Sequence, residues 1–333
     1  MTTINKQIHL VRRPVGEPTE ACFALVEKTL GDPGPGQVLV RNRFLSLDPY
    51  MRGRMDEAKS YAQPQALNEV MVGATSGEVL VSNHPDFKAG DTFAAKFGLG
   101  WQTHAIVKGE HIIKVDASRV PLSYYVGLLG MPGATAWYGT MKILEPAAGQ
   151  TLVVTAATGA VGGVVGQLAK AHGARVVGIA GGTAKCDYAV REMGFDACID
   201  YKAPGWKEAF KAATPDGVDR VFENVGGEIF DTILARMNPF GRIAVCGLIS
   251  GYNGTPMPIA NFRSVLVNKL RIQGFIISDH LEFWPQAHKE LADLVTAGRL
   301  KYRESVAEGL ESAPGAFLAM LKGGNFGKQI VRL

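Results

Sequence analysis

The sequence predicts an α/β protein that combines a doubly wound parallel sheet with a second, β-rich domain. Two observations carry this prediction. The middle of the chain alternates short apolar runs with helix-like segments, an order typical of parallel sheets covered by helices. The first third instead holds strand-like runs separated by glycine and proline turns. The chain has 333 residues, more than one compact core usually holds, so we expect two domains.

The β-rich character of the first third is carried by three runs with strand-like composition. They are Gln37–Leu45, Gly77–Val81 and His104–Lys108. A turn signal precedes the first run at Asp32–Gly36, and another separates the second and third runs at Lys88–Asp91. This pattern indicates a small, partly closed β-domain.

The alternation of strands and helices begins near Tyr125. Pro132 suits the first turn of a helix that runs to about Ile143. A strand, a turn of small residues, a helix and a second strand follow, which together make a β-α-β unit. The expected elements are the strand Thr151–Thr155, the helix Ala160–Ala171, the strand Arg175–Ile179, and the further strands Val218–Phe222 and Arg242–Cys246.

The last stretch returns to mixed character and closes the first domain. We expect helices at Trp284–Ala297 and Ser312–Lys322, each followed by a glycine, and a closing strand at Lys328–Arg332. The predicted domains are therefore residues 1–125 with 298–333, and residues 126–297.

The strongest local signal is the small-residue turn Ala156–Gly163, placed between a strand and a helix. Glycines at 159 and 162 let the backbone turn sharply and approach a pyrophosphate, while the helix start offers free N–H groups. The spacing is AxxGxxG rather than GxGxxG, so the prediction depends on the strand before the turn and the helix after it. The alternative is a turn that only packs a helix on a sheet.

The cofactor predicted from this unit is NADP rather than NAD. A strand that binds NAD usually ends in Asp or Glu, which holds the ribose hydroxyls. Here the second strand ends as Gly178–Gly182, without an acid, and Lys185 follows. A lysine offers positive charge to a 2′-phosphate. The alternative is a solvated lysine at the start of a helix.

Composition argues against several other classes of protein. A net charge of +4 without a Lys/Arg run does not fit nucleic-acid binding, and no apolar stretch is long enough to span a membrane. The segment Met1–Arg13 lacks the apolar core of a signal peptide. The four cysteines form no CxxC pair, so we expect a reduced, cytoplasmic setting; they are Cys22, Cys186, Cys198 and Cys246.

The histidines and cysteines also predict that the protein holds no metal. The segment Val70–Val81 has neither residue type, and the seven histidines are scattered without ligand-like pairing. Delivery of hydride to an activated C=C bond suits such a site, because a hydroxyl donor can stabilise the enolate that forms.

Five motifs together resemble one family over nearly the whole chain. They are Ser46–Met55, Ala157–Gly162, Phe222–Gly227, Cys246–Asn253 and Asn325–Gln329. The family is that of the zinc-independent medium-chain dehydrogenases/reductases, which include prostaglandin reductases (leukotriene B4 12-hydroxydehydrogenases), plant alkenal double-bond reductases and bacterial NADPH-dependent curcumin reductases. The resemblance implies a Rossmann-type NADPH-binding domain, a GroES-like catalytic domain and a homodimer. It also implies NADPH-dependent reduction of the C=C bond of enones and enals.

The resemblance also implies which residues contact the cofactor. Gly159, Ala160, Val161 and Gly162 would hold the pyrophosphate, and Lys185 with Tyr201 the 2′-phosphate. The remaining expected contacts surround the nicotinamide side and are Asn224, Cys246, Gly247, Ile249, Ser250, Tyr252, Phe275, Ile276, Ile277 and Asn325.

Tyrosines are the candidate catalytic groups of such a site. Tyr252 comes first because its motif lies beside the nicotinamide, followed by Tyr50 and Tyr61 from the segment expected to cover the substrate. Each tyrosine also has an alternative role. Tyr252 could only pack on the cofactor, or could orient a ribose hydroxyl of the cofactor that serves as the donor. Tyr50 and Tyr61 could be aromatic residues that only pack within the β-domain. Two other functions stay open, an NADPH quinone oxidoreductase and a non-catalytic NADPH-binding sensor or structural protein.

Overall fold

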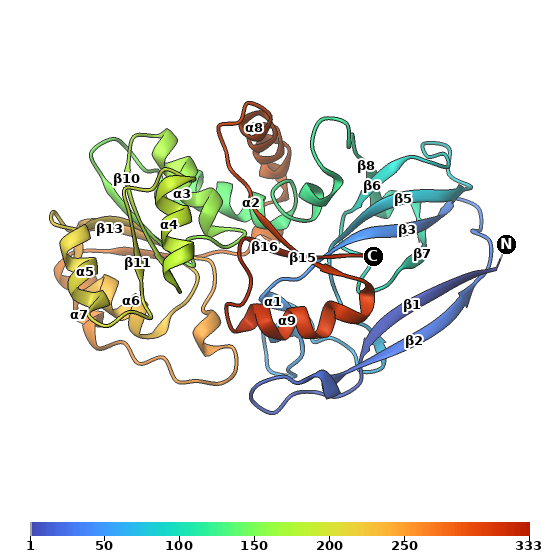
Figure 1. The fold of residues 1–333 in the computed structure, drawn as a ribbon, viewed down its shortest axis with the longest axis horizontal. Coiled ribbons are helices and arrows are strands. Elements are labelled where there is room, and N and C mark those ends of the chain that lie inside the picture. Colours follow the sequence, from blue (N-terminus) through green and yellow to red (C-terminus); the bar gives the residue numbers. More distant parts are fainter. Residues whose placement is uncertain (1) are drawn as a thin grey trace. The chain divides into compact units, whose positions relative to one another are not determined.

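The computed structural model describes residues 2–333, which form two compact units (Figure 1). The first unit holds the residues up to 130 together with 304–333, and the second holds 131–303. Both boundaries fall a few residues later than those predicted at 125/126 and 297/298. The hydroxyl of Ser76 donates to the carbonyl of Leu122 (2.9 Å) in the first unit, and the amide of Lys301 donates to Gln167 (2.7 Å) in the second.

The first unit is built on two sheets. The larger sheet has the order β15-β16-β3-β5-β6-β8, with β7 paired to β3, and the smaller has the order β2-β1-β4. The bounds are β1 Thr3–Leu10, β2 Phe23–Leu30, β3 Gln37–Ser46, α1 Tyr50–Arg54, β4 Glu69–Val70, β5 Thr75–Ser82, β6 Thr92–Ala95, β7 His104–Lys108, β8 Ile112–Lys114, β15 Glu304–Glu308, α9 Ala313–Leu321 and β16 Lys328–Arg332. The predicted strands of this unit are confirmed, since β3, β5, β7 and β16 contain them.

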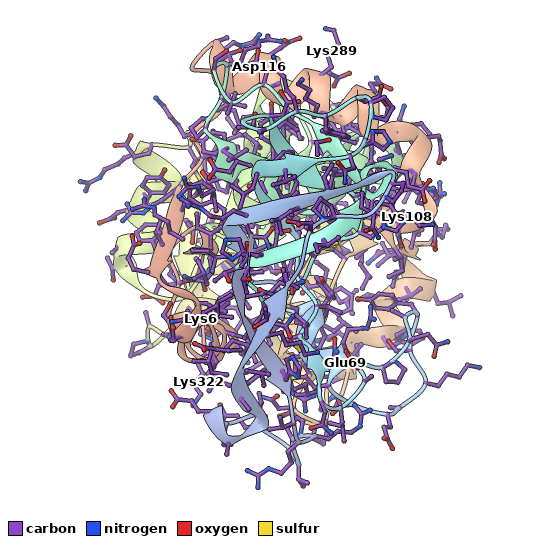
Figure 2. All side chains as sticks on the ribbon, turned by 90° about the vertical axis from the view of Figure 1, so that its right-hand side faces the viewer. Lys6, Glu69, Lys108, Asp116, Lys289 and Lys322 are labelled. Carbon is purple, nitrogen blue, oxygen red and sulfur yellow. The ribbon has the colours of Figure 1, made fainter. Side chains whose placement is uncertain are left out.

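A core of large side chains holds the first unit together. The fully buried ring of Trp101 stacks on Phe23 at 5.4 Å between ring centres, and Phe317 from α9 meets it edge-on at 5.7 Å. Aromatic pairs of this geometry contribute beyond the apolar area that they bury. Exposed charged side chains of both signs lie on the side of the unit seen in Figure 2, among them Lys108, Lys322 and Glu69.

The second unit is a parallel sheet of six strands in the order β11-β10-β9-β12-β13-β14. Its bounds are α2 Met131–Tyr138, β9 Thr151–Thr155, α3 Gly162–Ala171, β10 Arg175–Ala180, α4 Thr183–Arg191, β11 Ala197–Asp200, α5 Trp206–Ala213, β12 Val218–Glu223, α6 Gly227–Leu234, β13 Met237–Val245, α7 Arg263–Val267, β14 Arg271–Gly274 and α8 Trp284–Thr296. The chain moves outward from β9 to β11, then returns to β12 and moves outward the other way. This reversal makes the sheet doubly wound, as predicted.

Close packing of α3 against the residues between α4 and β11 explains why this helix is rich in glycine. A Cβ atom at Gly166 would lie only 1.9 Å from the ring of Phe195, and one at Gly163 would lie 2.9 Å from the methyl of Met193. Every residue of β9 is buried, which explains its continuous apolar run.

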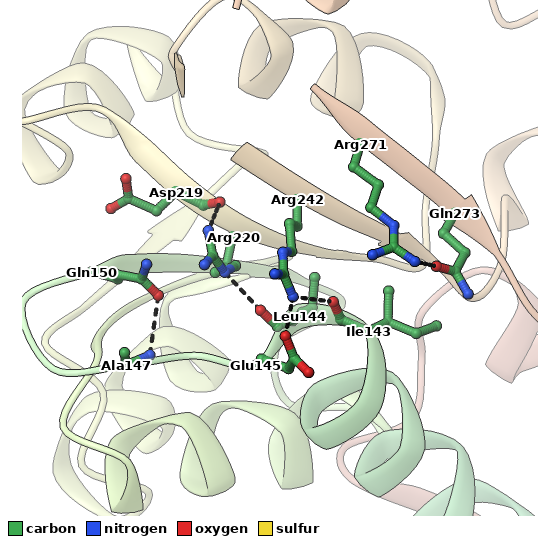
Figure 3. A network of polar contacts seen from close by, with 10 residues as sticks. All are labelled: Ile143, Leu144, Glu145, Ala147, Gln150, Asp219, Arg220, Arg242, Arg271 and Gln273. Atoms are coloured by element: carbon green, nitrogen blue, oxygen red, sulfur yellow. Dashed lines mark hydrogen bonds and ion pairs between the residues drawn. The ribbon is translucent and has the colours of Figure 1, made fainter. Parts of the chain in front are cut away.

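The predicted helix from Pro132 to Ile143 is confirmed, but its second half differs in kind. After α2 the chain continues as a π-helical segment, η4 (Gly139–Leu144). Two arginines from the sheet hold the end of this segment (Figure 3). Arg220 donates to the carbonyl of Leu144 (2.6 Å), while Arg242 donates to that of Ile143 (3.3 Å) and pairs with Glu145. These bonds satisfy carbonyls that the end of a helix leaves unpaired.

No helix within residues 2–333 is both long enough and apolar enough to cross a membrane.

Candidate functional site

The turn between β9 and α3 has the close backbone packing expected of a phosphate-binding turn. Ala156 adopts a positive φ of 49°, and its carbonyl accepts a hydrogen bond from the amide of Gly159 at 2.9 Å. A Cβ atom at Gly162 would lie 2.4 Å from the same carbonyl oxygen, so a larger residue would displace the backbone. The residues fit a pyrophosphate, because the turn leads directly into the start of a ten-residue helix.

The ends of β10 and β11 bring the residues expected at the 2′-phosphate together. A Cβ atom at Gly181 would lie 3.1 Å from the Tyr201 hydroxyl and 3.0 Å from Cε of Lys202. The amide of Gly182 donates to the carboxylate of Asp200 (2.8 Å), which fixes the loop before α4. Burial lowers the pKa of Lys185, and the positive charge of Lys202 lowers it further.

The positive charge of Lys202 acts on Lys185, and an anion bound near both groups would offset this repulsion. Lys202 therefore joins Lys185 and Tyr201 as a candidate contact of the 2′-phosphate. The sequence reasoning missed Lys202, although its place directly after Tyr201 was a usable signal.

Asn224 is held firmly at the carboxyl edge of the sheet, beside the end of β9. Its amide donates to the hydroxyl of Thr155 and its side chain to the carbonyl of Thr155, both at 2.8 Å. The preceding residue, Glu223, is completely buried and accepts from Thr155 at 3.1 Å. Sequence reasoning missed Glu223, since a glutamate at a strand end gives no sign of its burial.

The segment after β13 folds back onto the same edge. The amides of Cys246 and Gly247 donate to the carbonyl of Glu223 at 2.9 and 3.2 Å, and Ile249 donates to Asn224 at 3.2 Å. The hydroxyl of Tyr252 lies 3.2 Å from the position of a Cβ atom at Gly247, which places this tyrosine over the segment. The structure thus gathers Cys246, Gly247, Ile249, Ser250 and Tyr252 around Asn224.

Burial raises the pKa of the Cys246 thiol to about 12, with a further contribution from Glu223. The thiol is therefore protonated at neutral pH, which does not suit a nucleophile.

Of the expected contacts Phe275, Ile276 and Ile277, two lie in the core. Phe275 and Ile277 are buried, whereas Ile276 is partly exposed. The ring of Phe275 meets Phe222 edge-on at 6.1 Å, and a Cβ atom at Gly139 would lie 2.9 Å from it. Ile276 therefore offers the most accessible side chain of the three.

The first unit holds the other expected site residues. Tyr50 begins α1, and burial of its hydroxyl raises its pKa, as do the charge of Asp48 and the neighbouring Tyr61. Tyr61 itself is 61% exposed. Asn325 donates to the carbonyl of Gly327 at 2.7 Å.

A buried lysine connects the motifs Ser46–Met55 and Asn325–Gln329 of the first unit. The ammonium of Lys328 is 1% exposed and donates to the carbonyl of Leu47 (2.6 Å) and the carboxylate of Asp48 (2.7 Å). The hydroxyl of Ser46 also donates to Asp48. Lys328 thereby links the segment that carries Asn325 to the one that carries Tyr50. Sequence reasoning did not single it out.

The donor set does not fit a bound zinc ion. Among residues 2–333, no group of three or more His, Cys, Asp or Glu side chains is arranged to hold a metal.

The second unit, a doubly wound parallel sheet with a glycine turn after β9, has the fold typical of dinucleotide-binding domains. Residues 6–115 match the family model for the N-terminal domain of oxidoreductase, and residues 160–295 match the model for zinc-binding dehydrogenase. The chain is 44% identical over 336 residues to the NADPH-dependent curcumin reductase of Escherichia coli (strain K12), covering 99% of this chain and 97% of that protein. It is 39% identical over 335 residues to the NADP(+)-dependent 2-alkenal reductase of Nicotiana tabacum, covering 98% and 97%.

A solved structure agrees over the same length. CurA from Vibrio vulnificus in complex with NADPH superposes with a TM-score of 0.92 at 44% identity, covering 98% of each chain. The protein belongs to the medium-chain dehydrogenase/reductase family, in the group with the curcumin, alkenal and prostaglandin reductases.

Proposed function

We propose that this protein is an NADPH-dependent reductase of the C=C bond of α,β-unsaturated aldehydes and ketones. The observation that carries the proposal is the full-length similarity to an NADPH-dependent curcumin reductase, combined with the two lysines, Lys185 and Lys202, that follow β10 and β11. A 2′-phosphate distinguishes NADPH from NADH, and two lysines favour it electrostatically.

The residues of the second unit would hold the cofactor along the carboxyl edge of its sheet. Residues 159–162 would face the pyrophosphate, Lys185 and Tyr201 the 2′-phosphate, and Asn224 and the segment 246–252 the nicotinamide side. The bound cofactor supplies the hydride that reaches the β-carbon of the substrate.

The tyrosine hydroxyls provide the hydrogen bond that an enolate oxygen needs. Tyr252 is the first candidate because its hydroxyl lies against the backbone at Gly247, at the cofactor edge. Tyr50 is the second, and its raised pKa keeps its hydroxyl protonated, as a donor requires. Tyr61 is exposed and adjoins Tyr50, which suits a contact with substrate from the first unit.

We propose a separate role for each part of the chain. Residues 1–125 with 298–333 form the catalytic domain, to which Asn325 belongs, and residues 126–297 bind NADPH.

We also propose a homodimer built through the cofactor domain. Ile272 on the edge strand β14 and Leu266 and Val267 on the neighbouring α7 are exposed, and apolar residues beside the free side of an edge strand favour a second copy. The four free cysteines suit the cytoplasm.

A comparison of substrates and cofactors tests the proposal. The purified protein is mixed with NADPH and, in separate reactions, a medium-chain 2-alkenal, curcumin and a simple quinone, with NADH as the cofactor control. Oxidation of NADPH by the alkenal or curcumin, with little oxidation of NADH, supports it. Turnover of the quinone alone overturns the reaction while keeping the cofactor, and binding without turnover supports a sensor.

A further inference from the structure

The last residue of the strand β12 is Glu223, whose side-chain carboxyl group is completely buried. Glu223 has no exposed surface, and it lies between Thr155, at the end of β9, and Cys246, after β13. The strands β9 and β12 are neighbours in the sheet, and the phosphate-binding turn begins one residue after Thr155. Glu223 therefore lies directly beneath the edge at which the cofactor is proposed to bind.

The two oxygens of this carboxyl group have very different surroundings. Oε1 accepts three hydrogen bonds, from the Thr155 hydroxyl (3.1 Å) and from the amides of Val225 (2.5 Å) and Gly226 (2.7 Å). Oε2 is buried and has no hydrogen-bond partner among the described residues. One oxygen thus shapes the turn that holds Asn224, while the other is unsatisfied.

An ionised carboxylate with an unsatisfied buried oxygen is costly, and a proton removes most of that cost. Burial raises the pKa of Glu223 to about 7, although the three donors to Oε1 oppose the shift. The groups that face it are the Thr155 hydroxyl from β9, the amides of its own turn, and the Cys246 thiol from the segment after β13. The thiol stays protonated over the neutral range, so it does not compete for the proton.

We propose that Glu223 is a positioning residue of the cofactor edge, which holds the Asn224 turn and carries a proton while the dinucleotide is bound. This inference rests on the proposed binding of NADPH to the second unit. The phosphates of the cofactor are negative, so their approach to this edge favours the neutral form of the carboxyl group. Binding of NADPH therefore takes up a proton whenever Glu223 starts out ionised.

The sign of the pH dependence follows from linkage. Below about pH 7 the free protein already holds the proton, and binding takes up none at Glu223. Above that pH the free protein loses the proton, and the dissociation constant for NADPH rises by up to about tenfold per pH unit. The turn itself is unchanged, because both forms of the carboxyl group keep Oε1 as acceptor.

The test is the count of protons taken up by the whole protein on binding NADPH. Isothermal titration calorimetry at about pH 8, in two buffers of different ionisation enthalpy, gives this count directly. The variant Glu223→Gln keeps the acceptor and mimics the neutral form without titrating. Glu192→Gln is the matched control, because it removes an exposed carboxylate at the far end of α4, at the opposite edge of the same sheet.

The expected result is that the wild-type protein and Glu192→Gln take up close to one proton more than Glu223→Gln. Subtraction of the variant removes protons exchanged by the 2′-phosphate and by Lys185. Glu223→Gln should also bind NADPH with an affinity that changes least between about pH 7 and about pH 9.

Three outcomes overturn the inference. Equal proton counts for the wild type and Glu223→Gln mean that the carboxyl group does not titrate with binding. Loss of NADPH binding by Glu223→Gln at every pH means that the ionised form is required. Absence of binding by the wild-type protein at every pH overturns the proposed function as well, which distinguishes the two failures.

Discussion

Replacement of Lys328 by methionine removes the charge of the buried ion pair while keeping a side chain of similar length. The ammonium is 1% exposed and makes two hydrogen bonds, so its loss leaves Asp48, itself only 7% exposed, with the hydroxyl of Ser46 as its remaining side-chain partner. Breaking a buried pair in this way costs about 3–5 kcal/mol. For a domain of this size, each kcal/mol lowers Tm by about 2–4 °C, so a loss of about 6–20 °C is expected.

Thermal and urea unfolding followed by circular dichroism measure this loss. Lys322→Met is the control, because Lys322 forms an exposed pair with Glu17 (2.9 Å) and should change stability by less than about 1 kcal/mol. The double variant Lys328→Met with Asp48→Leu removes both charges and should recover part of the loss. A change of under about 1 kcal/mol for Lys328→Met alone would refute the claim that this pair joins the two motifs.

Four further predictions follow from the second unit. Lys185→Met and Lys202→Met should each raise the Kd for NADPH by about 10–100-fold and leave that for NADH unchanged, measured by fluorescence titration; equal effects on both cofactors would contradict the 2′-phosphate site. Gly162→Ala should destabilise the unit by about 1–3 kcal/mol in urea, because its Cβ would lie 2.4 Å from a carbonyl oxygen. Tyr252→Phe should lower kcat by about 100-fold with little change in KM, whereas a change in KM alone would indicate packing on the cofactor. Between pH 4.5 and about 7 native Glu223 keeps a proton that the unfolded chain has lost, so the contribution of this group to the free energy of unfolding falls as the pH rises. Glu223→Gln should therefore be more stable than the wild type by up to about 3 kcal/mol at about pH 8. Below about pH 4.5 the variant should have no such advantage.

The elements that were predicted well from the sequence are those whose own residues show the pattern of burial. The strand Thr151–Thr155 is bounded as predicted, because a run buried on both faces is apolar at every position. The helix that follows begins at Gly162, two residues later than predicted, since the glycine turn after β9 includes Ala160 and Val161. The boundary of β16 likewise agrees with the expected strand.

The features that the sequence hid depend on burial that only the folded chain creates. The strand β1 was not predicted, because it also buries polar residues, among them Asn5, whose side-chain amide donates to Gln102 at 2.7 Å. Glu223 and Lys328 read as ordinary surface charges until their neighbours in other elements are known. The π-helical end of the predicted helix depends on Arg220 and Arg242, which lie more than 70 residues further along the chain.

Isotope transfer tests the central claim most directly. The protein is given NADPH that carries deuterium at the transferable position of the nicotinamide, together with an α,β-unsaturated ketone, and the product is analysed by NMR. The proposed function predicts a saturated ketone with deuterium on its β-carbon. Deuterium on the former carbonyl carbon, in an unsaturated alcohol, would contradict it.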